Sequence, residues 1–284
     1  MTAGISVLTL VKGRHAHLTR LVEGLTRSDP PPGELVIVAM DEEPITLTPT
    51  TFPVRILTRP AATLPLAAAR NLAAAAATQP NLLFLDVDCI PMQGLPATMS
   101  DLLDRHDALI CPEIHYLPAG AVQSGWTQAA LLSRAVTHEA RRFPSDGVTT
   151  APHPGLFWSV AFGVRAARFA SLGGFDERFT GYGAEDTDLA FRADRAGLDI
   201  LLAGGPGAFH QHHPVFAPPL QHFDDILRNA RLFHETWGIW PMDGWLDHFA
   251  TIGLIARHGD QLTLRRKPTP TEIATARQPD HIVF

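Results

Sequence analysis

The feature that most constrains the fold of this sequence is an alternation of short aliphatic runs with helical segments between Ile5 and Asp88. The runs expected to form strands are Ile5–Val11, Leu35–Met40, Val54–Leu57 and Leu82–Leu85. Helical spacing is expected between them at His17–Leu25 and Leu66–Thr78. This order is typical of an α/β protein with a parallel sheet, in which loops at the carboxyl edge of the strands bind ligands.

The second half of the chain continues with less regular spacing. Helices are expected at Trp126–Arg142 and Glu185–Arg195, and strands at Phe157–Val164 and Ile200–Ala203. We expect one domain over residues 1–256, followed by a tail of uncertain order over 257–284.

Composition excludes several classes of protein. The net charge is -6 and there is no dense Lys/Arg run, so a protein that coats nucleic acid is not expected. The cysteines are Cys89 and Cys111, both in apolar surroundings, which indicates buried thiols in a reducing compartment. The most apolar stretch, Ala67–Ala77, is too short to span a bilayer, and the start of the chain does not resemble a secretion signal. We therefore expect a cytoplasmic protein without a transmembrane segment.

Two aspartates follow the apolar run that ends at Leu85. Asp86 and Asp88 are separated by one residue, and the end of a buried strand would bring them to the ligand edge of the sheet. Carboxylate oxygens bind hard divalent cations, which neutralise a phosphate leaving group. Short acidic pairs also cap helices and turns, so the motif alone does not decide the function.

A second acidic cluster runs from Gly181 to Asp188, before an expected helix. Its carboxylates would be stabilised by the free N–H groups of the first helical turn. An aspartate held there is also suited to remove a proton from an acceptor hydroxyl. Further along, His210, His212 and His213 offer imidazole ligands for a divalent metal, although a single histidine is more often structural.

These segments together resemble family 2 glycosyltransferases, and especially the β-1,4-galactosyltransferase-like branch with its galactosyltransferase C-terminal region. The resemblance extends over about Ile5 to Pro214. It depends on the ordered motifs Phe84-Leu85-Asp86-Val87-Asp88, Gly173-Gly174-Phe175-Asp176-Glu177 and Gly181-Tyr182-Gly183-Ala184-Glu185-Asp186. It implies a GT-A (Rossmann-like) fold, with a mixed, mostly parallel central sheet flanked by helices. It also implies a nucleotide-sugar-binding half at 1–110 and an acceptor-binding half at 111–256.

The resemblance implies a role for each matching residue. Asp186 would be the catalytic base. Asp88 would bind Mn²⁺ or Mg²⁺ with His210, and His212 is close enough in sequence to compete for that place. The implied donor-binding residues are Lys12, Arg14, Arg70, Asn71 and Asp86, and the implied acceptor-binding residues are Tyr182, Gly183 and Glu185.

The expected reaction is an inverting, metal-dependent transfer of a hexose from a nucleoside-diphosphate sugar, with UDP as the first choice, to a glycan or small-molecule acceptor. Tyr182 stands where the galactosyltransferases carry tryptophan, which leaves the sugar open. Two alternatives are a sugar nucleotidyltransferase, for which Lys12-Gly13-Arg14 is a poor phosphate loop, and a catalytically silent nucleotide-sugar-binding protein. A histidine-centred hydrolase is less favoured, because the histidines lack the helical spacing of zinc hydrolases.

Overall fold

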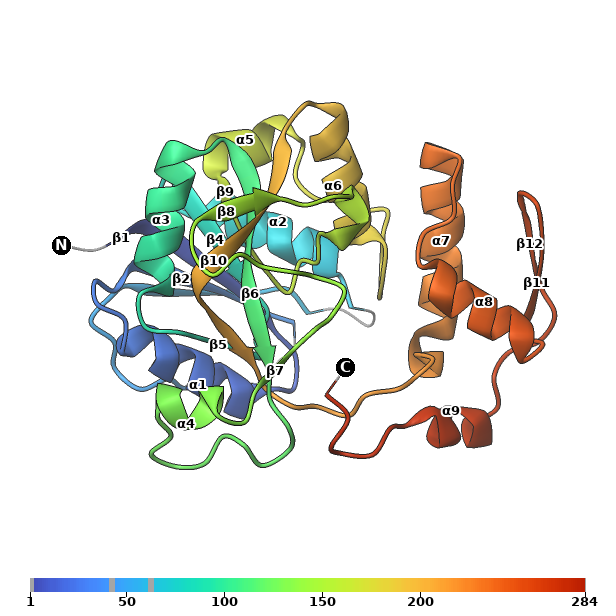
Figure 1. The fold of residues 1–284 in the computed structure, drawn as a ribbon, viewed down its shortest axis with the longest axis horizontal. Coiled ribbons are helices and arrows are strands. Elements are labelled where there is room, and N and C mark those ends of the chain that lie inside the picture. The colour runs from blue at the N-terminus through green and yellow to red at the C-terminus, as the bar shows by residue number, and fades with distance from the viewer. Residues whose placement is uncertain (1–2, 41–43, 61–63, 284) are drawn as a thin grey trace.

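The chain folds into a large mixed sheet with helices on both faces and a smaller C-terminal group of helices beside it (Figure 1). The structure is a computed structural model that describes residues 3–40, 44–60 and 64–283. Its strands in the main sheet are β1 (Ala3–Val11), β2 (Pro32–Ala39), β3 (Val54–Thr58), β4 (Asn81–Leu85), β5 (Cys89–Pro91), β6 (Ala108–Tyr116), β7 (Val136–Thr137), β8 (Val148–Thr150), β9 (Ala161–Arg165) and β10 (Asp199–His210).

The main sheet has the strand order β3-β2-β1-β4-β9-β6-β10-β5. The first four strands of this order pair in parallel, and β6 pairs in parallel with β10. Strand β9 is antiparallel to both β4 and β6, and β5 is antiparallel to β10. All four strands expected before Asp88 are present, and together with the flanking helices they make a mixed α/β fold.

Alternation along the strands directs apolar side chains to both faces of the sheet, and each face carries helices. On one face pack α1 (His15–Thr26) and α3 (Leu95–Arg105), whose leucines share a core with Ile5 and Val7 of β1. On the other face pack α2 (Leu66–Ala76), α5 (Ala166–Ser171) and α6 (Glu185–Arg195), which share a core with Leu8 and Leu10.

The expected helix at Trp126–Arg142 is wrong over most of its length. The structure has only α4 (Gln128–Leu132) there, followed by β7, which pairs with the end of β6. Val136 and Thr137 are β-branched and suit this edge pairing better than a helix. The expected strand at Phe157–Val164 is shorter, because η1 (Pro154–Leu156) precedes it and β9 begins at Ala161.

The C-terminal group contains η2 (Leu220–His222), α7 (Phe223–Trp237), α8 (Asp243–Thr251), β11 (Ile255–His258), β12 (Gln261–Leu264) and α9 (Pro270–Ala276). It has a core of its own that includes Phe223, Ile226 and Phe249. The segment expected as a tail, 257–284, thus contains a hairpin strand and a capped helix, and the boundary at Ala256 falls inside β11. At its end the chain returns to the sheet, where Val283 packs against the core that α1 and α3 share.

Candidate functional site

The two aspartates after β4 occupy a turn that leads directly into β5. The Cys89 N–H donates to the Asp86 carbonyl at 2.8 Å, which closes the turn. Strand β5 then pairs with the end of β10, with Cys89 opposite His210, and the Gln211 N–H donates to the Asp88 carbonyl at 2.7 Å. This antiparallel pairing brings the acidic strand end and the histidine cluster together.

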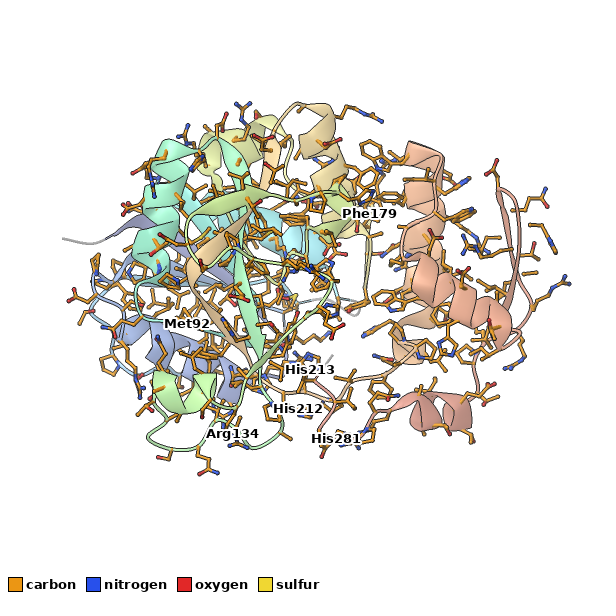
Figure 2. All side chains as sticks on the ribbon, viewed as in Figure 1. Met92, Arg134, Phe179, His212, His213 and His281 are labelled. Carbon is orange, nitrogen blue, oxygen red and sulfur yellow. The ribbon has the colours of Figure 1, made fainter. Side chains whose placement is uncertain are left out.

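One carboxylate and two imidazoles meet at this point. The ligand atoms of Asp88, His210 and His213 all lie within 4.8 Å of one another, and Asp88 is buried. His212 is not a member of this group among the residues described. Figure 2 shows His212 and His213 beside each other where the chain leaves the sheet. The structure therefore brings Asp88 and His210 together as expected, but with His213 in the place for which His212 was considered.

Asp88 has partners at the start of α1 as well as in the histidine cluster, where His213 Nε2 lies 3.8 Å from Asp88 Oδ2. Arg14 Nη1 forms an ion pair with Asp88 Oδ2, and His17 Nδ1 lies 2.5 Å from Asp88 Oδ1. Burial lowers the pKa of His17 to about 4, so the ring is neutral at pH 7 and its Nδ1–H donates to the carboxylate. His17 was not predicted, although its place in the first turn after β1 made it a candidate.

Arg70 connects the end of β4 with the start of α6. Its guanidinium is buried and donates to Glu185 Oε1 at 2.9 Å and to Asp86 Oδ1 at 3.3 Å. It also lies over the Phe175 ring, with Cζ 5.1 Å from the ring centroid. Burial, followed by the negative charge of Asp186, raises the pKa of Glu185 to about 7. The arginine thus holds together carboxylates that come from two distant motifs.

Asp186 lies in the same region, in the first turn of α6. Its Oδ2 accepts from the Ser159 N–H at 3.3 Å, while the Asp86 N–H donates to the carbonyl of Val160 at 2.9 Å. Both aspartates are therefore fixed by adjacent residues just before β9. Burial raises the pKa of Asp86, and the charge of Asp186 acts in the same direction.

The two other residues expected to bind the donor are Asn71 and Lys12. The Asn71 side chain donates to the Phe175 carbonyl at 2.9 Å and to Glu177 Oε1 at 3.0 Å, and accepts from the Phe175 N–H at 2.8 Å. Both ends of its amide therefore hold the loop after α5. Lys12 is exposed at the carboxyl end of β1, close in sequence to Arg14.

The expected acceptor residues adjoin the C-terminal group. Tyr182 stacks on His222, with ring centroids 4.4 Å apart and planes 13° apart, and its ring lies 5.9 Å from that of Trp245. The buried Asn229 of α7 donates to the carbonyls of Tyr182 and Gly183 at 3.3 and 2.9 Å. Asn229 was not predicted, because its partners lie in a separate motif. The loop before α6 is thus held by α7 and faces an aromatic stack.

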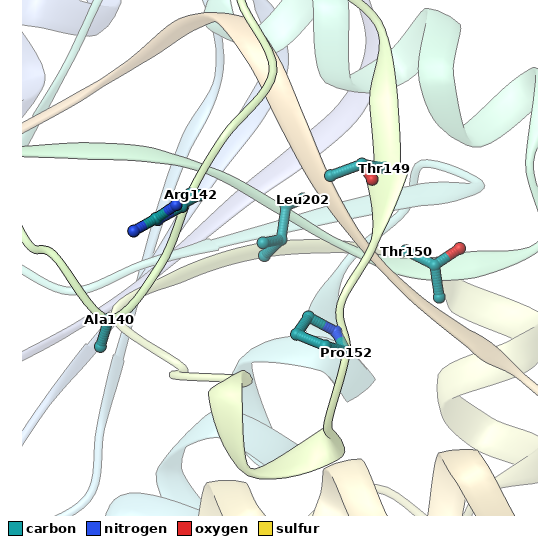
Figure 3. A pocket seen from close by; sticks show the side chains of 6 residues that line it. All are labelled: Ala140, Arg142, Thr149, Thr150, Pro152 and Leu202. Atoms are coloured by element: carbon teal, nitrogen blue, oxygen red, sulfur yellow. The ribbon is translucent and has the colours of Figure 1, made fainter.

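Two further features lie beside these residues. The Tyr116 ring at the end of β6 has its centroid 5.1 Å from that of His210, so a residue not singled out in the sequence borders the histidines. A surface pocket lies on the segment between β7 and β8 and has a volume of about 340 Å³; Figure 3 shows the side chains that line it. It is lined by Ala140, Arg142, Thr149, Thr150, Pro152 and Leu202. None of the candidate residues lines it, so we do not place the substrate there.

Comparison with known proteins agrees with these motifs. A family model described as "N-terminal domain of galactosyltransferase" matches residues 156–214. The chain is 32% identical to the pre-mycofactocin glycosyltransferase of Mycobacterium tuberculosis over 148 residues, which is 51% of this chain and 30% of the relative. It is 40% identical over 47 residues to the validoxylamine A glucosyltransferase of Streptomyces hygroscopicus subsp. jinggangensis, covering 16% of this chain and 11% of that protein. The chain thus spans less than a third of the length of these curated relatives.

The solved structures decide the fold. TarS of S. aureus (residues 1–349) superposes with a TM-score of 0.53 at 16% identity, covering 81% of this chain and 64% of that one. GalNAc-T7, solved with UDP, GalNAc and Mn²⁺, gives a TM-score of 0.55 at 15% identity, covering 74% of this chain and 43% of that one. The chain has the GT-A glycosyltransferase fold.

The GT-A fold confirms the expected class, and the relatives confirm the predicted resemblance to glycosyltransferases. In this GT-A chain the candidate residues gather at the carboxyl edge of β1 and β4 and at the start of α6, where α/β sheets bind ligands. No helix in the described part of the chain combines the length and the apolar character that crossing a membrane requires.

Proposed function

We propose that this chain transfers a hexose from a nucleoside-diphosphate sugar, with UDP as the expected nucleotide, to a hydroxyl of a glycan or small-molecule acceptor. The reaction would be one inverting displacement. One observation carries this proposal: Arg70 links Asp86 to Glu185, so the acidic end of β4 and the acidic start of α6 line the same region. A displacement needs a held leaving group and a base near each other, and this link supports both.

Asp186 is the proposed base. Its neighbour Glu185 is engaged by Arg70 and buried, which leaves the more accessible Asp186 to meet the acceptor. Asp186 Oδ1 accepts from the Thr187 N–H at 2.8 Å and Oδ2 accepts from Ser159, which fixes the carboxylate. Tyr182, Gly183 and Glu185 would orient the acceptor, with the Tyr182 ring as one face of its binding surface.

Asp88, His210 and His213 are the proposed metal ligands. A mixed set of one carboxylate and two imidazoles suits Mn²⁺ better than Mg²⁺, which prefers oxygen ligands. When bound, the ion would supply neutralising charge to the departing diphosphate. Arg14, which pairs with Asp88 here, would then be released toward the phosphates, with Lys12 nearby. His17 would keep the carboxylate oriented.

The neighbours support the nucleotide part of the proposal. TarS has been solved in complex with UDP and with UDP-GlcNAc, and GalNAc-T7 with UDP and Mn²⁺. A sugar nucleotidyltransferase stays the nearest alternative, and would release pyrophosphate from a nucleoside triphosphate and a sugar phosphate. A silent nucleotide-sugar-binding protein would bind the donor without any release of UDP.

The deciding experiment compares Asp186→Asn with Asp194→Asn, an exposed aspartate of the same helix. A nucleotide sugar that binds with Mn²⁺ is first found by thermal shift, and release of the nucleoside diphosphate is then followed with a panel of hydroxyl acceptors. We expect Asp186→Asn to lose about 100-fold or more in rate while donor binding persists. Asp194→Asn should behave as wild type. A near-normal rate for Asp186→Asn would remove that residue from the role of base.

A further inference from the structure

A row of four aromatic rings starts at one of the proposed metal ligands. The centroid of the Tyr116 ring lies 5.1 Å from that of His210 and 6.4 Å from that of His138. The His138 ring in turn lies 4.8 Å from the Trp158 ring, with the two planes at 85°. The row therefore connects His210, at the end of β10, with Trp158, just before β9.

The backbone after Trp158 reaches both acidic motifs of the candidate site. Ser159 is the next residue, and its N–H donates to Asp186 Oδ2 at 3.3 Å. The carbonyl of Val160 accepts from the Asp86 N–H at 2.9 Å. The row of rings thus ends beside the residue proposed as the base.

A buried arginine holds one side of the Trp158 ring. Arg141 is 4% exposed, and its Cζ lies 4.3 Å from the Trp158 ring centroid. The same Cζ lies 5.4 Å from the Phe143 ring centroid, and the guanidinium hydrogen bonds with the Tyr116 side chain. A guanidinium over an indole attracts the ring electrostatically, so the contact fixes Trp158 against the protein on this side.

The remaining surface of Trp158 is open to solvent. The residue is partly exposed, although Arg141 and His138 cover part of its ring. Its indole N–H is not buried and has no acceptor among the described residues. The indole N–H groups of Trp126 and Trp237, by contrast, donate to carboxylates. Trp158 thus offers a ligand an apolar ring surface and a hydrogen-bond donor side by side.

The position of Trp158 indicates which part of a substrate it would contact. In a single displacement, the anomeric carbon lies between the leaving phosphate and the attacking hydroxyl. The phosphate would lie at the metal ligands and the hydroxyl at Asp186, so the transferred hexose would lie along the row of rings between them. A hexose has ring C–H bonds, which suit the negative face of an indole, and hydroxyl oxygens, which accept from its N–H.

We propose that Trp158 binds the transferred hexose of the donor through the exposed surface of its ring and its indole N–H. Arg141 is then a positioning residue that holds the ring. The proposal rests on the proposed function, because it needs a nucleotide sugar with its diphosphate near Asp88. A ring of the acceptor has the same chemistry and is the second possible source of the contact.

Binding measurements on the whole chain separate the sugar from the nucleotide. A UDP-hexose that binds with Mn²⁺ is found by thermal shift, and calorimetry then compares it with UDP on wild type, Trp158→Leu and Trp240→Leu. Trp240 is also partly exposed and also packs on a histidine, His234, at 4.0 Å, but it belongs to the C-terminal group. We expect Trp158→Leu to weaken binding of the UDP-hexose by about 5-fold or more and binding of UDP by less than about 2-fold. Trp240→Leu should change neither affinity by more than about 2-fold.

Each outcome decides. Wild type that binds neither UDP nor a UDP-hexose overturns the proposed function, and the inference with it. Wild type that binds both, with Trp158→Leu weakened equally for both or for neither, overturns the assignment to the donor alone. The KM of the acceptor at saturating donor then separates two cases. A rise of about 5-fold or more in Trp158→Leu assigns the contact to the acceptor, and an unchanged KM overturns the sugar contact altogether.

If Trp158→Leu does not fold, Trp158→Phe decides. It keeps an aromatic ring over Arg141 but has neither the indole N–H nor the indole fluorescence. The emission of wild type should change more with the UDP-hexose than with UDP, and this difference should be absent from Trp158→Phe. The same difference in both proteins contradicts the proposal.

The positioning role of Arg141 has its own comparison. Arg141→Gln removes the cation over the ring and should weaken binding of the UDP-hexose about 3-fold with UDP unchanged, whereas Arg141→Lys keeps a cation there and should stay closer to wild type. Arg142→Gln, at an exposed arginine one residue away, controls for net charge and should behave as wild type. An equal loss for UDP and the UDP-hexose would show that Arg141 supports the fold only.

Discussion

At the scale of single residues, the candidate site divides into side chains that a local motif reveals and side chains that only the fold assembles. Asp86 and Asp88 could be predicted because an apolar strand ends just before them, and Asp186 because it follows a glycine-rich turn. His17 and Arg141 could not, and among the three candidate histidines the sequence did not single out His213. Their partners lie far away in sequence, and no local pattern encodes the pairing of β5 with β10 that brings the histidines to Asp88.

The metal group gives a residue-scale prediction that separates two adjacent histidines. His213→Ala should weaken Mn²⁺ binding by about 10-fold or more, because it removes one imidazole of the group with Asp88 and His210. His212→Ala, outside that group, should change the affinity by less than about 2-fold. Titration of Mn²⁺ by calorimetry or by its electron paramagnetic resonance signal measures both. The reverse ranking would return the ligand role to His212.

The raised pKa of Glu185 gives a pH prediction. Its pKa is about 7 in the fold and 4.5 as its ordinary value, so the stability it contributes is present below about pH 4.5 and is lost as pH rises through 7. Glu185→Gln removes this ionisation. Between about pH 5 and about pH 8 the free energy of unfolding of this variant should therefore fall less than that of wild type. The difference between the two decreases should be on the order of 2 kcal/mol.

Urea unfolding at several pH values measures this difference. Glu235→Gln, at an exposed carboxylate of α7, is the control and should follow the wild-type curve. A Glu185→Gln curve parallel to wild type over the whole range would show that Glu185 does not titrate there.

At the scale of elements, most helices and strands were predictable where the pattern is strong, and Glu185–Arg195 coincides with α6. The region 126–142 could not be predicted from its helical spacing. There, β7 pairs at the edge of the sheet and the Arg141 side chain is buried, so most of the expected helix does not form. The polar segment after Arg257 also gave no local signal of order. Its strand and helix are stabilised by contacts that spacing alone does not reveal, such as the bridge between Phe216 and Arg277.

The loop before α6 gives a prediction at this scale. Gly183 has φ +96°, and a Cβ there would lie 2.9 Å from Met242 Sδ. Gly183→Ala should lower the free energy of unfolding by about 1 to 3 kcal/mol and shift Tyr182, which weakens any acceptor bound there. Gly244→Ala is the control, because a Cβ at that position in α8 meets no atom within 4 Å. Equal stability of the two variants in thermal denaturation would contradict this account of the loop.

At the scale of the whole molecule, the sheet and the C-terminal group meet where α6 contacts α7. Asp188 is 1% exposed and accepts from Trp237 Nε1 at 3.0 Å and from Arg192 Nε at 2.8 Å. Asp188→Ala leaves both donors without this partner, so the free energy of unfolding should fall by about 3 to 5 kcal/mol. Because the C-terminal group has its own core, we expect calorimetry to resolve two transitions for this variant and a single transition for wild type.

The exposed Asp194→Ala is the control for this junction and should keep a single transition near the wild-type temperature. If Asp188→Ala also unfolds in one step with unchanged enthalpy, the two parts are coupled by contacts other than this one.

The return of the chain end to the sheet, where Val283 packs against the core that α1 and α3 share, bears on how the aromatic stack can move. The C-terminal group leaves the sheet after β10, and its last residues contact the sheet again. The group is therefore attached to the sheet at both ends. A group of helices attached to the sheet at both ends can rotate about the line that joins the two attachment points. It cannot open by a hinge motion at one end. The stack at Tyr182 should therefore keep a nearly constant distance from Asp186, and acceptor choice would then depend on its shape more than on domain closure.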